Sequence, residues 1–229
     1  MYAAITADII GSAKLEPALR DQIYQLLQSE FELLGQKTKM KFPFESLRGD
    51  SFQGVASTTE YAFELALLLK CVFKKSLITF EEQRNTNATA TIRKNWRIYN
   101  TLDIRISIGI GPIEYLRETL AQSDGTALRL SGRSLDKMKS KNQKLLITSE
   151  NEKLNRQFEV ELKLLDAVID KWTPMSAEVV YYLLLNNNET ETALLLNISQ
   201  SAINQRKKTA NWEAIDMIKE YYKELIKEV

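Results

Sequence analysis

Histidine is absent from this chain, and cysteine occurs once in 229 residues. The absence of histidine excludes a Ser-His-Asp triad, a histidine-ligated zinc ion and an imidazole general base. Any catalysis would therefore use carboxylates, lysine, arginine, tyrosine or a metal ion. The single cysteine, Cys71, excludes an intrachain disulfide and a cysteine zinc cluster. It lies in the apolar run 67–73, which indicates a buried structural thiol rather than a nucleophile.

The chain also has little net charge and no long apolar run. Lysine and arginine total 31 against 30 aspartates and glutamates, so only local charge can point to a partner. No apolar run approaches the roughly 20 residues needed to cross a bilayer, and residues 1–8 lack the basic segment of a signal peptide. We expect a cytoplasmic protein without a membrane partner.

Two short stretches each place an aspartate near a glycine at the edge of an expected strand. Residues 7–12 read Ala-Asp-Ile-Ile-Gly-Ser and contain Asp8, and residues 48–52 read Arg-Gly-Asp-Ser-Phe and contain Asp50. Two carboxylates that meet in space would bind a divalent metal ion, and the glycines would let a phosphate approach the backbone. Taken singly, Asp8 could cap a turn and Asp50 could be a hairpin-turn residue.

Hydrophobic periodicity predicts strands mixed with helices up to residue 148. A strand over 2–7 is expected to precede a helix that begins near Pro17 and ends near Gly35. The further expected elements are a hairpin of 44–47 and 52–56, a helix over 61–72, a strand over 103–109 with 113–116 as its hairpin partner, a helix over 126–140 and a strand over 145–148. Residues 92–99 are expected to be helical, and the role of 76–100 stays open.

From residue 151 onward the pattern indicates helices only, with a break at 172–174. Strands mixed with helices before this point and helices alone after it favour two domains. We expect an α+β domain over 1–148 and a helical domain over 149–229.

Residues 190–208 have the layout of a helix-turn-helix. A first helix ends at 195–196, a tight turn follows at 197–198, and a serine is placed to cap a second helix. The side chains expected to bind double-stranded DNA are Ser199, Gln200, Ser201, Asn204, Gln205, Arg206, Lys207 and Lys208. The stretch resembles the helix-turn-helix of sigma-factor-like bacterial regulators. The alternative is a helical bundle used for dimerisation, with 206–208 as a solvated face.

Four segments, taken in order, resemble the catalytic domain of class III nucleotidyl cyclases. They are Asp8-Ile9-Ile10-Gly11 after the first strand, Gly49-Asp50 in a hairpin, 105–111 in a strand and 129–133 in a helix. The resemblance covers about residues 1–148. With a helix-turn-helix at its end, the whole chain looks most like the bacterial SatD family.

This resemblance implies an α+β fold, with a ferredoxin-like (palm-type) domain followed by an all-α helix-turn-helix domain. Asp8 and Asp50 would hold Mg²⁺ or Mn²⁺ over a nucleoside triphosphate, whose 3′-hydroxyl attacks the α-phosphate. The residues implied to contact the nucleotide are Ile9, Ile10, Gly11, Ser12, Gly49 and Arg129. Arg133 aligns with the catalytic arginine of the family. The chain departs from the family at Ser46, where a base-selecting lysine or glutamate is typical, and at Arg129, where an asparagine is typical.

Three functions are compatible with these features. The first is a DNA-binding regulatory protein whose cyclase-like domain senses a nucleotide. The second is an active nucleotidyl cyclase or nucleotidyltransferase that uses two metal ions. The third is a protein-interaction module that keeps degenerate motifs. Class III cyclase sites form between two protomers, and helix-turn-helix proteins read two half-sites, so we expect a homodimer.

Overall fold

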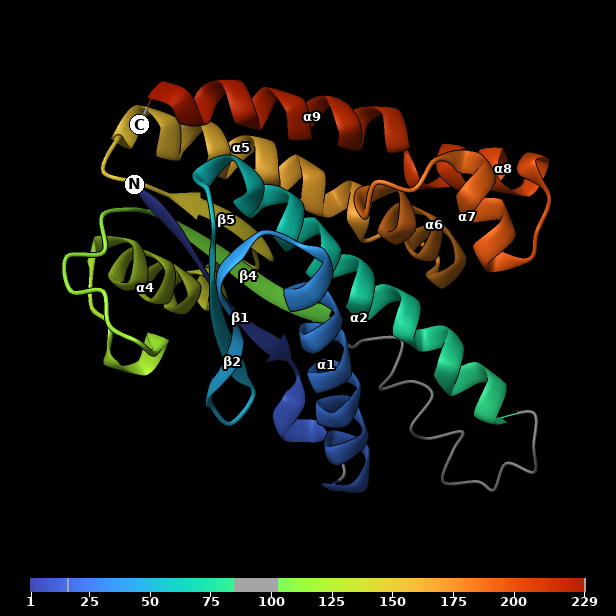
Figure 1. Cartoon of the computed structure of the whole chain (residues 1–229), viewed down its shortest axis with the longest axis horizontal. Helices are drawn as coiled ribbons and strands as arrows, with labels where there is room; N and C mark the ends of the chain where they lie inside the picture. The colour runs from blue at the N-terminus through green and yellow to red at the C-terminus, as the bar shows by residue number, and fades with distance from the viewer. Residues whose placement is uncertain (16, 85–102, 229) are drawn as a thin grey trace.

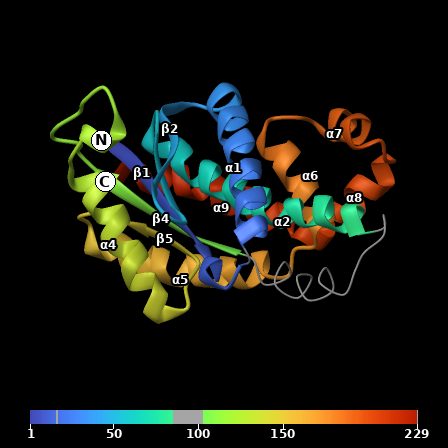
Figure 2. The ribbon, with the colours of Figure 1, turned by 90° about the horizontal axis from the view of Figure 1, so that it is seen from below.

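The computed structural model describes residues 1–15, 17–84 and 103–228, without the side chains of 18, 19, 48, 76–84 and 228. The helix expected over 92–99 lies outside these residues. Within them, the chain is a mixed α/β structure in which helices cover both faces of a five-stranded sheet (Figures 1 and 2). The expected mixture of strands and helices is therefore confirmed.

The sheet has the strand order β2-β3-β1-β4-β5. Its strands are β1 Tyr2–Ile10, β2 Met40–Arg48, β3 Ser51–Ala56, β4 Asp103–Gly111 and β5 Leu145–Thr148. The central strand β1 runs antiparallel to its neighbours β3 and β4, whereas β5 runs parallel to β4. A parallel pair needs a crossover connection, and helix α4 (Thr126–Lys141) provides it.

One face of the sheet carries the main hydrophobic core. Every second side chain of β1 and β4 points to it, so that Ile5 lies opposite Ile108 and Ala7 opposite Ile106, all fully buried. The helices that contribute to this core are α1 Pro17–Lys37, α2 Ala62–Arg84, α5 Glu152–Ile169, α6 Pro174–Leu184 and α9 Trp212–Leu225. The alternation expected for 103–109 is thus confirmed as a strand buried on this face.

Helix α2 is buried on every side over residues 62–73. The sequence pattern indicated a single apolar face, but α6 and α9 pack against the side of α2 that faces away from the sheet. Most side chains of a helix enclosed in this way are apolar, and here Glu64 and Lys70 are the buried charged exceptions. Cys71 is one of the apolar side chains and is fully buried, as expected, and burial raises the pKa of its thiol.

The opposite face of the sheet is covered by α4. The closest approach is at Gly109, where an added Cβ would lie 2.2 Å from the Ala127 carbonyl oxygen and 2.4 Å from the Ser131 nitrogen. Below α4, Thr6 Oγ1 lies 2.7 Å from Ser131 Oγ and accepts a 2.6 Å hydrogen bond from Gln53 Nε2. This buried polar group joins β1, β3 and α4 and keeps each of its members hydrogen-bonded.

The sequence predicted that residues 113–116 form the hairpin partner of β4, and this prediction is wrong. The chain after Gly111 forms an irregular connection, and a single isolated bridge joins Tyr115 to Asp124. The neighbour position along β4 is already taken by β1 on one side and by β5 on the other. A second strand adjacent in sequence therefore has no free edge to pair with.

The helices after residue 150 fall into two groups. Helices α5 and α9, with part of α6, contribute to the main core. Helices α7 (Glu189–Leu196) and α8 (Gln200–Ala210) pack with α6 around a small separate cluster of Val179, Ala193 and Ile203. Figures 1 and 2 both place α6–α8 at the end of the molecule opposite α4. The boundary expected near 150 stays a prediction, but packing is continuous across it.

Candidate functional site

The fold brings the two aspartate-glycine stretches to one corner of the sheet. Asp8 lies directly opposite Ser51 in the β1–β3 pair, and the Ile9 amide donates a 3.2 Å hydrogen bond to the Asp50 carbonyl. The Ser12 hydroxyl, in the short 3₁₀ turn after β1, donates to the Asp50 carboxylate. Gly11 and Gly49 both have positive φ, at 80° and 51°, so each is suited to its turn. We call this region the Asp8–Asp50 corner.

Asp8 is held by Arg105 from the neighbouring strand. Arg105 Nε and Nη2 donate to the two carboxylate oxygens of Asp8, each at 2.8 Å. The hydrogen bonds to Asp8 raise the pKa of Arg105. Lys139, near the end of α4, places its ammonium 3.7 Å from Asp8 Oδ2. Asp8 is 4% exposed, so its charge is compensated inside the protein rather than by solvent.

Helix α1 adds a third cation and a phenol to the corner. Arg20 Nη2 donates a 3.2 Å hydrogen bond to the Ser12 carbonyl, while its buried Nε has no partner among the described residues. The Tyr24 hydroxyl donates to the Gly49 carbonyl. Burial and the nearby charge of Asp50 raise the pKa of Tyr24. The corner therefore gathers three cationic side chains, Arg20, Arg105 and Lys139, around two carboxylates.

A cavity of about 840 Å³ opens beside the Gly49–Asp50 turn, between α1 and the β2–β3 hairpin. Its lining residues are Tyr24, Leu27, Gln28, Phe31, Glu32, Gly35, Gln36, Pro43, Phe44, Glu45, Ser46, Gly49, Ser51 and Phe52. The ring centroids of Phe44 and Phe52 lie 5.3 Å and 4.8 Å from that of Phe31. An apolar, aromatic cavity with a few polar groups is suited to a planar heteroaromatic ring. Ser46, the expected base-selecting position, lies in this lining.

The donor set does not fit a metal centre in this conformation. Both oxygens of Asp8 are engaged by Arg105, and one oxygen of Asp50 accepts from Ser12. Among residues 1–15, 17–84 and 103–228, no three acidic or cysteine side chains cluster as metal ligands. A metal ion at Asp8 would have to share the carboxylate with Arg105 or displace it, since both oxygens already accept from that guanidinium. The metal site stays a prediction.

No protein-family model, no curated protein and no solved structure matches the chain. The function must therefore be inferred from the geometry of the chain itself. None of the helices that the structure describes is both long and apolar enough to cross a membrane.

Two arginines of α4 were expected at the nucleotide, and neither contacts Asp8 or Asp50 in the described part of the chain. Arg129 binds the connection before the helix, with 3.0 Å contacts to Asp124 and a 3.2 Å contact to Glu114. Ten residues of helix separate it from Lys139, or about 15 Å at 1.5 Å per residue. Arg133 is exposed and makes no ion pair within the described part of the chain. The structure thus brings Ser12 and Gly49 into the corner beside both aspartates, but not Arg129.

Helices α7 and α8 are joined by a short turn over 197–199. Asn188 caps α7 through a reciprocal pair of hydrogen bonds with Glu191. The turn contains Asn197 in the left-handed conformation, with φ of 52°, a region that asparagine tolerates better than most residues. The Ser199 hydroxyl then accepts from the Ala202 amide and caps α8, as the sequence indicated. Each end of the motif is therefore fixed by local hydrogen bonds.

The cations of α8 are less available than the sequence indicated. Arg206 lies 3.4 Å from Glu178, and Lys207 forms an ion pair with Glu189. Lys208 is exposed and has no ion-pair partner in the described part of the chain. The polar side chains on the exposed side of α8 are Gln200, Ser201, Asn204 and Gln205. This surface presents mainly amides and hydroxyls, with one unpaired charge.

The sequence analysis missed Arg20, Tyr24, Arg105 and Lys139 as members of the corner. Arg105 carried a usable signal, because a cation between two isoleucines of a buried strand requires a carboxylate on a neighbouring strand. The other three come from α1 and α4, and their approach depends on how those helices cross the sheet. Only the tertiary structure could assign them.

A second charged cluster lies at the start of β4, on the core side. Lys70 has no exposed surface, and its ammonium lies 3.3 Å from Asp103 Oδ1. Lys144 and Lys74 approach the other oxygen, at 2.9 Å and 3.8 Å. Burial would raise the pKa of Asp103, but the three lysines outweigh it and hold the pKa at about 2. Burial lowers the pKa of Lys70. These contacts join α2, β4 and the start of β5.

Proposed function

We propose that this chain is a DNA-binding regulatory protein whose α/β part binds a nucleotide at the Asp8–Asp50 corner. The observation that carries the DNA-binding half is the α7–α8 pair, joined through Asn197 in the left-handed conformation and capped at Ser199. This geometry leaves the α8 residues 201, 204, 205 and 208 exposed, as a helix that enters the major groove requires.

The exposed side chains of α8 favour base reading over strong phosphate binding. Asn204 and Gln205 carry amides that can bind an adenine through two hydrogen bonds. Because Arg206 and Lys207 are paired with glutamates, Lys208 is the α8 cation best placed for a phosphate. We therefore expect modest affinity for each copy of the motif and a shallow dependence on salt.

The test is duplex binding by fluorescence anisotropy, first with a randomised DNA pool and then with the selected site. Lys208→Ala should weaken binding to all duplexes alike and reduce by about one the slope of the logarithm of the binding constant against the logarithm of salt concentration. Asn204→Ala should reduce the binding free energy by about 1–3 kcal/mol for the selected site only. Arg206→Ala is the matched control, because its cation already binds Glu178. Failure of the protein to retain any duplex at low salt would refute the DNA-binding half.

The ligand half rests on the three cations gathered at the Asp8–Asp50 corner and on the cavity beside the Gly49–Asp50 turn. Arg20, Arg105 and Lys139 supply charge for phosphates, and the backbone at Gly11 can be approached closely because it lacks a side chain. The cavity between α1 and β2 accepts the base. The β-α-β-β-α-β connectivity of β1 to β4, with β1 central, supports a ferredoxin-like, cyclase-type interpretation of this part.

Thermal unfolding with each of the four nucleoside triphosphates, with and without Mg²⁺, tests this half. A ligand at 100 times its Kd adds about 2.7 kcal/mol, which corresponds to a Tm increase of roughly 5–11 °C for a chain of this length. Leu27→Trp should abolish the increase by filling the cavity, and Arg20→Ala should reduce it. Lys37→Ala, an exposed cation at the far end of α1, is the control. No increase with any nucleotide would leave an interaction module as the remaining interpretation.

Nucleotidyl cyclisation or transfer is the second candidate, favoured by the meeting of Asp8 and Asp50 at one corner. Both oxygens of Asp8 accept from Arg105 here, so we derive no metal-dependent step from this conformation. A product assay by thin-layer chromatography with Mg²⁺ or Mn²⁺ separates the candidates. Product that disappears in Asp8→Ala and in Asp50→Ala would establish the enzyme, and nucleotide binding without product would establish the sensor.

A further inference from the structure

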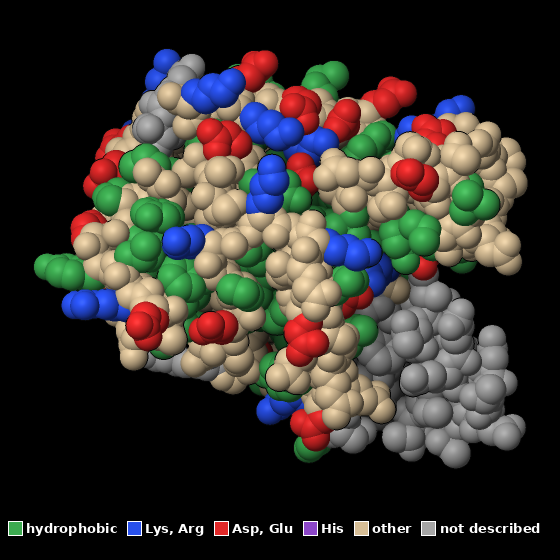
Figure 3. Space-filling view, viewed as in Figure 1, with side chains coloured by type: hydrophobic (Ala, Val, Ile, Leu, Met, Phe, Trp, Pro, Cys, Tyr) green, Lys and Arg blue, Asp and Glu red, His purple; other side chains and the backbone are tan. Residues whose placement is uncertain are grey.

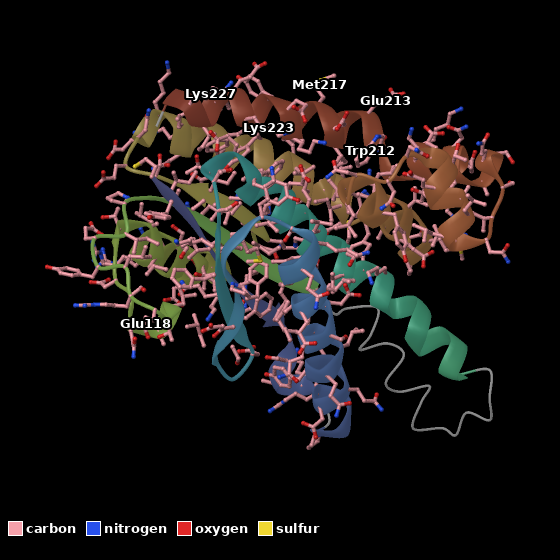
Figure 4. All side chains as sticks on the ribbon, in the orientation of Figure 1. Glu118, Trp212, Glu213, Met217, Lys223 and Lys227 are labelled. Atoms are coloured by element: carbon pink, nitrogen blue, oxygen red, sulfur yellow. The ribbon has the colours of Figure 1, made fainter. Side chains whose placement is uncertain are left out.

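Helices α5 and α9 lie antiparallel to each other on the outside of the molecule. The Trp172 indole donates a 2.9 Å hydrogen bond to the Ala210 carbonyl, which ties the end of α5 to the start of α9. At the other end, Gln157 Nε2 donates to the Tyr221 hydroxyl at 3.0 Å. The two helices therefore form one continuous surface, which we call the α5–α9 face. Figure 4 shows Glu213 and Met217 along the outer edge of α9.

The centre of this face is apolar and exposed. Val160 and Leu164 of α5 are 63% and 67% exposed, and Met217 and Tyr221 of α9 are 72% and 42% exposed. In each helix the two residues are four apart, so they lie side by side. Val160 and Leu164 each follow a buried core residue by two positions, which turns them away from the sheet. Four large apolar side chains gathered in this way indicate an interaction surface.

The exposed charges around this apolar centre are mostly cations on α5 and acids on α9. The exposed cations on and just after α5 are Lys153, Arg156, Lys163 and Lys171, against two exposed acids, Glu152 and Asp170, of which Asp170 is paired with Lys144. The exposed acids of α9 are Glu213, Glu220 and Glu224, while its lysines are half-buried. Within the described part of the chain, Lys153, Arg156, Glu213 and Glu224 form no ion pair. In Figure 3 red and blue side chains intermingle along the upper edge, where α9 lies.

We propose that the α5–α9 face binds a second copy of this chain, with α5 of each copy lying on α9 of the other. A two-fold axis parallel to the helices gives this arrangement and brings the exposed cations of α5 onto the exposed acids of α9. A two-fold axis in the face but perpendicular to the helices would place α5 on α5 and α9 on α9, with like charges opposed. Charge complementarity therefore selects the first arrangement. Val160 and Leu164 then cover Met217 and Tyr221 of the partner.

This assembly would present both helix-turn-helix units at the same end. Helix α8 ends at Ala210 and α9 begins at Trp212, so each unit lies at the start of α9. An axis parallel to α9 keeps the two starts together. Two recognition helices at one end can read two half-sites of a duplex. This consequence rests on the proposed DNA binding, whereas the dimer itself does not.

Sedimentation velocity of the full chain without DNA, over micromolar concentrations, tests the interface. We expect a dimer for the natural sequence, and an increase of at least about tenfold in its dissociation constant for Leu164→Glu, because a buried interface centre carries most of the binding energy. Leu194→Glu changes an equally exposed leucine of α7 and should leave the dissociation constant unchanged. All of these side chains are exposed, so the fold is retained, and unchanged thermal unfolding of the monomer confirms it.

A charge exchange tests the arrangement of the helices. Arg156→Glu and Glu224→Lys should each weaken the dimer, and the double variant should restore it to within about threefold, because each copy then presents the reversed pair. Restoration would support α5 on α9, since an arrangement of α5 on α5 cannot be restored this way. A monomer at every concentration, or a dimer that Leu164→Glu leaves intact, would overturn the proposal. Neither result would alter the case for DNA binding by α8.

Discussion

Replacing Arg105 should reveal how much the Asp8–Asp50 corner depends on one ion pair. In Arg105→Met the carboxylate of Asp8 stays in place, with 6% of its side chain exposed, and among the described residues its remaining ion-pair partner is Lys139, whose ammonium lies at 3.7 Å. Removing one partner of a buried ion pair typically costs about 3–5 kcal/mol. Because Lys139 compensates part of the charge, we expect a loss of about 2–4 kcal/mol in the free energy of unfolding. For a chain of this length, that lowers Tm by roughly 4–16 °C.

The partner variants complete a double-mutant cycle. Asp8→Asn should cost about 1–2 kcal/mol, less than Arg105→Met, because the Arg105 side chain is 19% exposed and can reach solvent. The double variant leaves no buried charge, so its cost should fall short of the sum of the two single costs by about 2 kcal/mol. Lys139→Met is the matched control, with a cation that is 52% exposed, and should cost less than about 0.5 kcal/mol.

Urea unfolding followed by circular dichroism measures all four free energies. Equal denaturant slopes across the variants would show that the same cooperative unit unfolds in each. Single costs that add to within about 0.5 kcal/mol would refute the reasoning, because they would mean that the two side chains do not interact. A coupling of the expected size would show that Arg105 is the side chain that holds the Asp8 carboxylate at the corner.

The remaining predictions concern the fold. The pKa of Asp103 is lowered to about 2 in the folded state, so its contribution to the free energy of unfolding is present above its unfolded pKa and is lost as pH falls from about 4 to about 2. Urea unfolding over this pH range should show a loss of about 2 kcal/mol for the natural sequence and no such loss for Asp103→Asn. Lys70→Met should cost less than Asp103→Asn, since Asp103 would keep two other lysines. Gly109→Ala should lower the free energy of unfolding by about 3 kcal/mol or more, because its Cβ would clash with α4. Gly132→Ala has open space around it and should raise that free energy by about 0.5–1 kcal/mol, measured by thermal unfolding. Asn197→Gly should leave stability within about 0.5 kcal/mol and Asn197→Val should lose about 1–2 kcal/mol, measured by urea unfolding and by duplex binding.

Local chemistry made several elements predictable. The alternation over 103–109 indicated a strand, and β4 spans it. The serine at 199 indicated a cap, and its hydroxyl accepts from the Ala202 amide. The strand expected at 113–116 failed for a non-local reason, because both edges of β4 were already occupied. The single apolar face expected for α2 failed similarly, since helices from the far end of the chain enclose it.

The sequence by itself determined the types of element, the absence of imidazole chemistry, and the residues that had to lie at turns and caps. These depend on groups within a few positions of one another, which the order of residues specifies directly. The tertiary structure alone decided that Arg105 forms an ion pair with Asp8, that Arg206 and Lys207 are paired with glutamates, and that α5 and α9 lie side by side in one face. Each of these is a contact between elements distant in sequence. Charge and burial at such contacts depend on how helices cross the sheet, and no local pattern encodes that crossing.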